Sequence, residues 1–345
     1  MRWVELAVSL AVVLAGAEIF TNGVEWTGEG FGLSEGVVGS ILAAIGTALP
    51  ETTIPFVAIL SGHHGGDEIG TGAILGAPLM LSTIAMCLLG ASVLGFGRRG
   101  RRSKELRPER DVVELDLGYF MIAFGLTVIA GVWHLRALHW ALAGALVAGY
   151  GFYVRRHFRM GGEREEEREA VGEVRPLYLL VWWRRIRGLR SDVGRKPPVS
   201  LSVAQLIVGL GVIVGGAKIF VSAVEVLAAR LGVPSLPFSL LIAPIATELP
   251  ELFNSVLWIR RGKDTLAMGN VTGAMVFQST FPVSIGLVFT SWRLTGDGLI
   301  AGVVALGAAG AVLLTLRVRH GLNPKLLALQ ATLFGAYVTY VLLTL

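Results

Sequence analysis

Apolar residues along the chain come in long blocks, and short polar stretches separate them. Most blocks reach about 20 residues, the length that an α-helix needs to cross about 30 Å of hydrocarbon. The ten blocks that can be delimited predict ten transmembrane helices. The predicted spans are 3–25, 34–60, 69–95, 115–133, 137–155, 200–229, 234–259, 265–290, 297–316 and 323–344. The pattern therefore predicts an all-α polytopic membrane protein.

The second half of the sequence repeats the first. The segment AGAEIFTNGVEW at 15–26 aligns with GGAKIFVSAVEV at 215–226, and IGTALPETTIPF aligns with IATELPELFNSV at the same offset of 200 positions. Each half holds five predicted spans, and an odd number makes the second half enter the membrane from the opposite side. Such inverted repeats are common in secondary transporters, which bind substrate near the midplane. We expect a first five-helix repeat at 1–155, a charged cytoplasmic linker at 156–199 and a second repeat at 200–345.

Charge follows the predicted topology. Charged residues make up 16% of the chain, against about 25% in typical soluble domains. Most of the 30 Lys and Arg residues lie in alternate loops, whereas the opposite loops and ends carry only Arg2, Arg136, Arg230 and Arg293. Positively charged loops mark the cytoplasmic side. We therefore expect a multi-pass protein of the cell (inner) membrane with both termini outside. Contact with phospholipid then accounts for the net charge of +5 without a nucleic-acid partner.

Two matching motifs, GTALPE and ATELPE, place a proline and a glutamate inside predicted spans. Pro50 and Pro250 each remove a backbone donor and disturb the helix. Carbonyl oxygens freed in this way persist in a membrane only where protein, water or an ion satisfies them. Glu51 and Glu251 follow the prolines directly, and carboxylates inside the membrane are functional candidates by default.

A threonine precedes each of these glutamates by four residues. Thr47 and Glu51, like Thr247 and Glu251, would share one face of a helix. Each repeat therefore offers a carboxylate, a hydroxyl and loosened carbonyls at one point. These hard oxygen ligands suit Ca²⁺, Na⁺ or Mg²⁺ rather than soft metals. The single cysteine, Cys87, excludes an internal disulfide and a cysteine metal cluster.

The motifs GTALPE and ATELPE, with the later GNVTGA, resemble the two alpha repeats of the cation/calcium antiporter superfamily, which includes sodium/calcium exchangers. The alpha-repeat segments of this chain would be 45–83 and 245–280. The resemblance implies ten helices in two inverted halves that work by alternating access. It also implies that Glu51 and Glu251 are the main cation ligands, with the two threonines beside them.

The chain departs from the family pattern at several positions. The family's serine after threonine is Ala48 in the first repeat and Glu248 in the second. In the later part of the motif, the family's serine-asparagine pair and last asparagine or aspartate are lost, leaving Pro78 and Leu81 in the first repeat and Gln278 in the second. Three carboxylates would remain, with amide support from Gln278 and a further contribution from Asn254 or Asn270.

Glu248 is the carboxylate without a counterpart in the other repeat. Clustered carboxylates resist joint ionisation, which favours coupling to protons. Glu248 is the candidate proton carrier, and the alternative is that it turns away from Glu251 onto a neighbouring helix. A second charged pair, Glu18 and Lys218, occupies equivalent positions in spans one and six. These two side chains would pair, face a crevice or extend to a water-filled edge.

These features predict a secondary antiporter that exchanges Ca²⁺ for Na⁺ or H⁺ without a cofactor or an obligatory protein partner. The alternative is a proton-coupled antiporter of another cation. An intramembrane enzyme with carboxylates as acid and base is disfavoured, because the spans contain no nucleophile–base pair and no His-rich metal motif. A scaffold would not need duplicated Pro-Glu breaks, and a passive channel lacks a filter-like motif.

Overall fold

The computed structural model describes residues 2–31, 48–60, 65–98, 103, 105–133, 135–161, 176–186, 197–319 and 321–344, and the described chain is helical. The first half contains α1 (Arg2–Gly30), α4 (Leu49–Leu60), α5 (Gly66–Met80), the π-helix η2 (Leu81–Ala85), α6 (Met86–Arg98), α7 (Arg110–Trp133) and α8 (Arg136–Gly161). The remainder contains α10 (Tyr178–Ile186), α11 (Val199–Leu231), α12 (Ser235–Thr247), α13 (Leu249–Arg260), α14 (Asp264–Gln278), α15 (Phe281–Phe289), α16 (Gly296–Arg319) and α17 (Pro324–Thr344).

Eight helical segments in these ranges are long and apolar enough to cross a membrane. They confirm the expectation of an all-helical, multi-pass membrane protein. The other two predicted spans differ from the expectation. Residues 234–259 form two shorter helices, α12 and α13, which meet at Glu248. Of 34–60, the described part is Ala48 and the short helix α4, and the rest lies outside the described residues.

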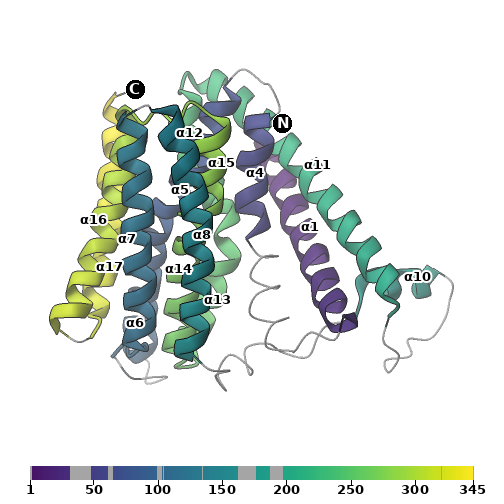
Figure 1. The fold of residues 1–345 in the computed structure, drawn as a ribbon, viewed down its shortest axis with the longest axis horizontal. Coiled ribbons are helices and arrows are strands. Elements are labelled where there is room, and N and C mark those ends of the chain that lie inside the picture. The colour runs from purple at the N-terminus through teal and green to yellow at the C-terminus, as the bar shows by residue number, and fades with distance from the viewer. Residues whose placement is uncertain are drawn as a thin grey trace.

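The helices α1 and α11 pack along each other and stand diagonally beside the other helices (Figure 1). Glycines allow the close approach. A Cβ on Gly16 would lie 2.9 Å from the backbone nitrogen of Ile213, and a Cβ on Gly216 would lie 2.8 Å from Cγ2 of Val13. The two contacts are equivalent: Gly216 corresponds to Gly16, and Ile213 to Val13, at the offset of 200 positions that relates the two halves of the sequence.

The loops are tied together at both ends of the bundle. At one end, a β-bridge joins Leu106 to Leu322, and the backbone nitrogen of Arg107 donates to Oδ2 of Asp264 at 2.8 Å. At the other end, the Arg136 guanidinium donates to the carbonyl oxygens of Val288 and Thr290. The N- and C-termini lie at the same end (Figure 1). The first set of loops is the arginine-rich set that the charge pattern predicts to be cytoplasmic.

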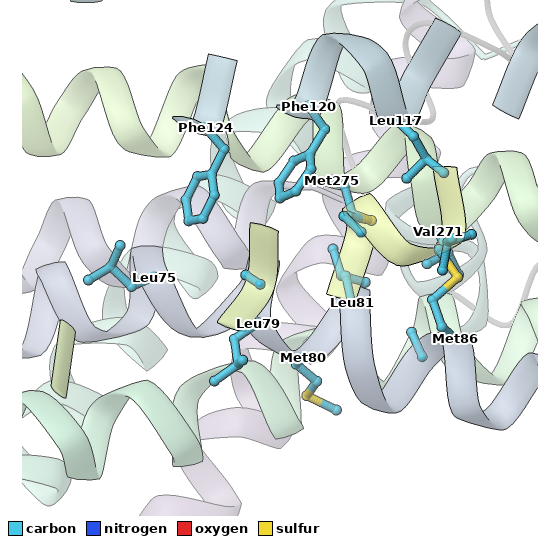
Figure 2. Packing of buried hydrophobic residues seen from close by; sticks show 14 of the residues in the cluster. Leu75, Leu79, Met80, Leu81, Met86, Leu117, Phe120, Phe124, Val271 and Met275 are labelled. Carbon is cyan, nitrogen blue, oxygen red and sulfur yellow. The ribbon is translucent and has the colours of Figure 1, made fainter. Parts of the chain in front are cut away.

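A large apolar core lies between α5, α7, α14 and the helices beyond them. In Figure 2, Leu117 and Phe120 of α7 lie over Val271 and Met275 of α14. Leu81, the first residue of the π-helix, is fully buried in the same cluster. This core fixes the positions of the helices that carry the candidate site.

Candidate cation site

Each Pro-Glu motif begins a helix. Pro50 is the second residue of α4 and Pro250 the second residue of α13, so Glu51 and Glu251 both lie in a first helical turn. Proline is well tolerated there because its missing N–H would have no partner inside the helix. The sequence had suggested prolines inside continuous helices, whereas the structure places them at helix starts. The positive end of each helix dipole therefore faces a carboxylate and offsets part of the cost of burying it.

Glu51, Glu248 and Glu251 converge. One carboxylate oxygen from each lies within 4.8 Å of the others, and the three residues are 7%, 1% and 8% exposed. Both oxygens of Glu51 and one oxygen of each of the other two have no hydrogen-bond partner. Among the described residues, no ion pair with Lys, Arg or His neutralises them. At such separations each pair of ionised carboxylates repels by roughly 3 kcal/mol at an effective dielectric constant of about 20. The cluster therefore requires bound cations or protons.

Glu248 points into this cluster and not away from it. It follows the last residue of α12 and precedes α13, so its side chain lies at the break between the two helices. The Nε2 amide of Gln278 donates to Oε1 of Glu248 at 3.3 Å, and Oε1 of Gln278 is buried without a partner. Gln278 therefore lies beside the carboxylates with an amide oxygen that has no hydrogen-bond partner.

A small cavity adjoins Glu51. It has about 10 Å³ of free space, about enough for one water molecule. It is lined by Glu51, Ile54 and Pro55 of α4, Ala73 and Ala77 of α5, and Ala243, Pro244 and Thr247 of α12. Small side chains leave this space where α5 and α12 meet, and a Cβ on Gly76 would lie only 2.1 Å from the carbonyl oxygen of Leu240. The cavity gives the cluster room for a small ligand.

The other predicted residues take different positions. Thr247 lines the cavity as the last residue of α12, and Glu248 separates it from α13, which carries Glu251. Its hydroxyl donates to the carbonyl oxygen of Ala243 at 3.3 Å, which leaves its lone pairs available. Thr47 and the side chain of Asn254 lie outside the described residues.

Asn270 of α14 is hydrogen-bonded to α13 beside the site. Its amide donates to the backbone oxygen of Glu251 and to Oγ of Ser255, both at 3.0 Å, and thereby ties α14 to α13. Glu18 accepts a hydrogen bond at 2.6 Å from the Tyr178 hydroxyl of α10. Lys218 is exposed on α11. These contacts place Asn270 next to the cluster, whereas Glu18 and Lys218 belong to the α1–α11 pair.

Two features of the site were missed in the sequence. Pro244 and Pro55 line the cavity, and their signal was proline within an apolar span. The π-helix at Leu81–Ala85 interrupts the third span next to Pro78, where no break was expected.

The fold and the cluster define a class of protein: a membrane transporter whose helices break around buried carboxylates. The model of the family described as "Sodium/calcium exchanger protein" matches residues 1–158 and 201–345. The chain belongs to this family, as the alpha-repeat motifs had indicated, and the family consists of transporters and not enzymes.

Individual relatives are distant but extend over most of the chain. CaxA of Alkalimonas amylolytica is 22% identical over 319 residues, 88% of this chain and 82% of CaxA. The inner membrane protein YrbG of Escherichia coli K12 is 24% identical over 263 residues, 75% of this chain and 71% of YrbG. The crystal structure of the H⁺/Ca²⁺ exchanger CAX is similar with a TM-score of 0.68 and 17% identity, covering 99% of this chain and 86% of CAX. A structure of the sodium-calcium exchanger NCX_Mj gives a TM-score of 0.54 and 19% identity, covering 98% and 97%. At these identities, the two solved structures support the fold alone.

Proposed function

We propose that the chain is a secondary cation antiporter that exchanges Ca²⁺ for H⁺ at the carboxylate cluster. The observation that carries the proposal is the convergence of three buried glutamates that have no cationic partner among the described residues. Hard oxygen ligands of this kind suit Ca²⁺, and the relatives CAX and NCX_Mj are calcium exchangers by name. Transport needs no cofactor and no protein partner in this scheme.

The proposed architecture has two inverted five-helix repeats, 1–155 and 200–345, joined by a cytoplasmic linker at 156–199. The matching contacts of Gly16 and Gly216 between α1 and α11 support it. In this architecture of ten spans, α4 and the α12–α13 pair bring glutamates to the midplane. In the inner membrane, the arginine-rich loops would face the cytoplasm and both termini the outside.

The proposed roles follow from the geometry. Glu51 and Glu251 are the main cation ligands, because each begins a helix from the opposite half of the chain. Thr247 supplies a hydroxyl oxygen from the cavity wall, and Thr47 is proposed as its counterpart on sequence grounds. Glu248 and Gln278 complete the site, and Glu248 carries the exchanged proton. A cation that leaves would be replaced by protons, since the three negative charges cannot persist together without compensation.

The direct test uses the purified chain in proteoliposomes, with Ca²⁺ uptake measured under a pH gradient and under a Na⁺ gradient imposed separately. We expect the pH gradient to drive uptake without Na⁺. Strict dependence on Na⁺ would overturn proton coupling and leave Na⁺/Ca²⁺ exchange. Uptake of Mn²⁺ or Mg²⁺ but not Ca²⁺ would favour a proton-coupled antiporter of another cation, the second candidate that the cluster allows.

Two substitutions test the site itself. Glu51→Gln and Glu251→Gln keep the side-chain size and remove a charge from the cluster, and each should reduce uptake by at least about thirtyfold, since loss of a buried charged partner costs about 2–5 kcal/mol. Glu68→Gln is the matched control, because Glu68 is exposed in the first turn of α5. Normal uptake by both site variants, with intact folding, would show that the cluster is not the transport site.

A further inference from the structure

A second buried carboxylate lies outside the candidate cation site. Asp116 of α7 is fully buried, within a helix long and apolar enough to cross the membrane. The neighbouring Leu117 belongs to the apolar layer that packs on Val271 of α14 (Figure 2). A carboxylate in such surroundings is costly to bury unless hydrogen bonds satisfy it.

Two hydroxyl groups from two other helices donate to this carboxylate. Tyr153 of α8 donates to Oδ1 of Asp116 at 2.9 Å, and Thr272 of α14 donates to Oδ2 at 2.6 Å. The Thr272 oxygen also lies 3.0 Å from the carbonyl oxygen of Met268, but its single proton favours the charged acceptor. His157, one turn beyond Tyr153 on α8, lies 3.9 Å from Oδ1. Asp116 therefore links α7, α8 and α14 at one point.

The helix that Asp116 holds carries two contacts to the cation site. Asn270 of α14 donates to the backbone oxygen of Glu251, and Gln278 at the end of α14 donates to the carboxylate of Glu248. Thr272 lies between these residues, roughly 9 Å along the helix from Gln278 at 1.5 Å per residue. A shift of α14 at Thr272 would therefore move the amide groups that hold both glutamates of the second half.

We propose that Asp116 is a positioning residue for the cation site: through its hydrogen bond with Thr272 it fixes α14 against α7 and α8, and so holds Gln278 against Glu248. In this proposal Asp116 is not itself a cation ligand. The inference rests on the proposed function, because the hydrogen bond between Thr272 and Asp116 would act on the affinity of the carboxylate cluster for Ca²⁺. Sequence motifs gave no sign of it, since Asp116 stands alone in LDLGYF near the start of a span.

The test compares two substitutions at Thr272 in proteoliposomes. Thr272→Val keeps the shape and removes the hydroxyl, so the half-saturating Ca²⁺ concentration should rise roughly tenfold while the maximal rate stays within about twofold. Thr272→Ser restores the hydroxyl and should return the half-saturating concentration close to that of the wild type. This split between affinity and rate, with rescue by serine, is not expected from general loosening of the fold.

The matched control is Thr127→Val. Thr127 is a fully buried threonine of α7 whose hydroxyl donates to the carbonyl oxygen of Phe124 in its own helix. The substitution removes a buried hydroxyl without taking a donor from a carboxylate, so it should leave the half-saturating Ca²⁺ concentration unchanged. If Thr272→Val does not fold, Tyr153→Phe gives the second measurement, with a smaller rise of about threefold because Tyr153 holds Asp116 and not α14.

The outcomes separate this inference from the proposed function. If Glu251→Gln abolishes uptake but neither Thr272→Val nor Tyr153→Phe changes the half-saturating concentration, Asp116 is structural only and the inference is wrong. If Glu251→Gln leaves uptake unchanged, the proposed site fails whatever the Thr272 variants do. A tenfold rise that serine does not reverse would also contradict the inference, because the hydroxyl would then not be the cause.

Discussion

The two halves of the motif region share a backbone plan and differ in their ligands. In both, a glutamate begins a helix after proline, as Glu51 does in α4 and Glu251 in α13. In both, the following span is interrupted, by the π-helix after Met80 in one half and by the break between α14 and α15 in the other. The chemistry at the interruption differs, since the first half presents the apolar Leu81 and the second half Gln278.

The interruptions are held in the same way. Ser82 and Thr83 donate to the carbonyl oxygen of Leu79. Ser279 and Thr280, 197 positions further along the chain, donate to that of Val276 at 2.8 and 2.9 Å. Side-chain hydroxyls thus satisfy backbone oxygens near each break, as membrane helices require. The backbone plan is therefore common to both halves, and the second half alone adds the carboxylate and the amide that distinguish this cluster.

Among the changes that make the two halves alike, the largest expected effect comes from removing that added carboxylate. Glu248→Ala makes the second half match Ala48 of the first, and uptake driven by a pH gradient should fall at least about tenfold, because a buried charged group with a hydrogen-bond partner is lost. The decisive measurement is the rate across a pH series. Uptake that remains should depend less on pH, since the proposed proton carrier is absent.

Glu251→Gln serves as the comparison for Glu248→Ala, because it should lose uptake at every pH. The proposed roles, Glu251 as cation ligand and Glu248 as proton carrier, would be disproved if uptake by Glu248→Ala kept the full pH dependence of the wild type. Loss of uptake at every pH, equal to that of Glu251→Gln, would instead make Glu248 a main cation ligand.

The second effect is smaller and concerns the interruption itself. Gln278→Leu gives the second half the side chain that the first half has at Leu81, and removes the amide that donates to Glu248. Loss of a group that orients a ligand should raise the half-saturating Ca²⁺ concentration by about tenfold. Gln278→Glu, which keeps an oxygen but adds a charge, is the informative companion. An unchanged half-saturating concentration in Gln278→Leu would mean that the amide only fills space.

Much of this arrangement could be predicted from the sequence, and the reasons are physical. Apolar blocks longer than a bilayer is thick leave few alternatives to membrane helices. The duplicated Pro-Glu motif singled out Glu51 and Glu251 as candidate site residues, because carboxylates inside the membrane at corresponding positions of two repeats have few purely structural explanations. The lack of a counterpart singled out Glu248, but only the structure decided between the cluster and a neighbouring helix.

Other features depended on contacts that no local pattern encodes. A continuous helix was expected over 234–259, but the helix breaks at Glu248 because Pro250 lies in the first turn of a new helix, α13. The brace from Asn270 and the hydrogen bond between Asp116 and Thr272 join residues that are 19 and 156 positions apart. Whether a polar residue binds an ion or holds a helix depends on which side chains the packing brings within reach, so spacing alone could not assign these roles.

The smallest effect tests whether the two interruptions are equivalent. Thr83→Val and Thr280→Val each remove a buried hydroxyl that donates to a carbonyl oxygen four residues earlier. Hydrogen bonds inside membrane proteins contribute about 0.6 kcal/mol on average, so both variants should lose thermal stability by a similar small amount and keep most of their Ca²⁺ uptake. Thr315→Val on α16 removes a similar bond, to Ala311 at 2.8 Å, away from the site and provides the baseline. A much larger loss of uptake in Thr280→Val than in Thr83→Val, at equal stability, would mean that the break between α14 and α15 moves during transport while the π-helix does not.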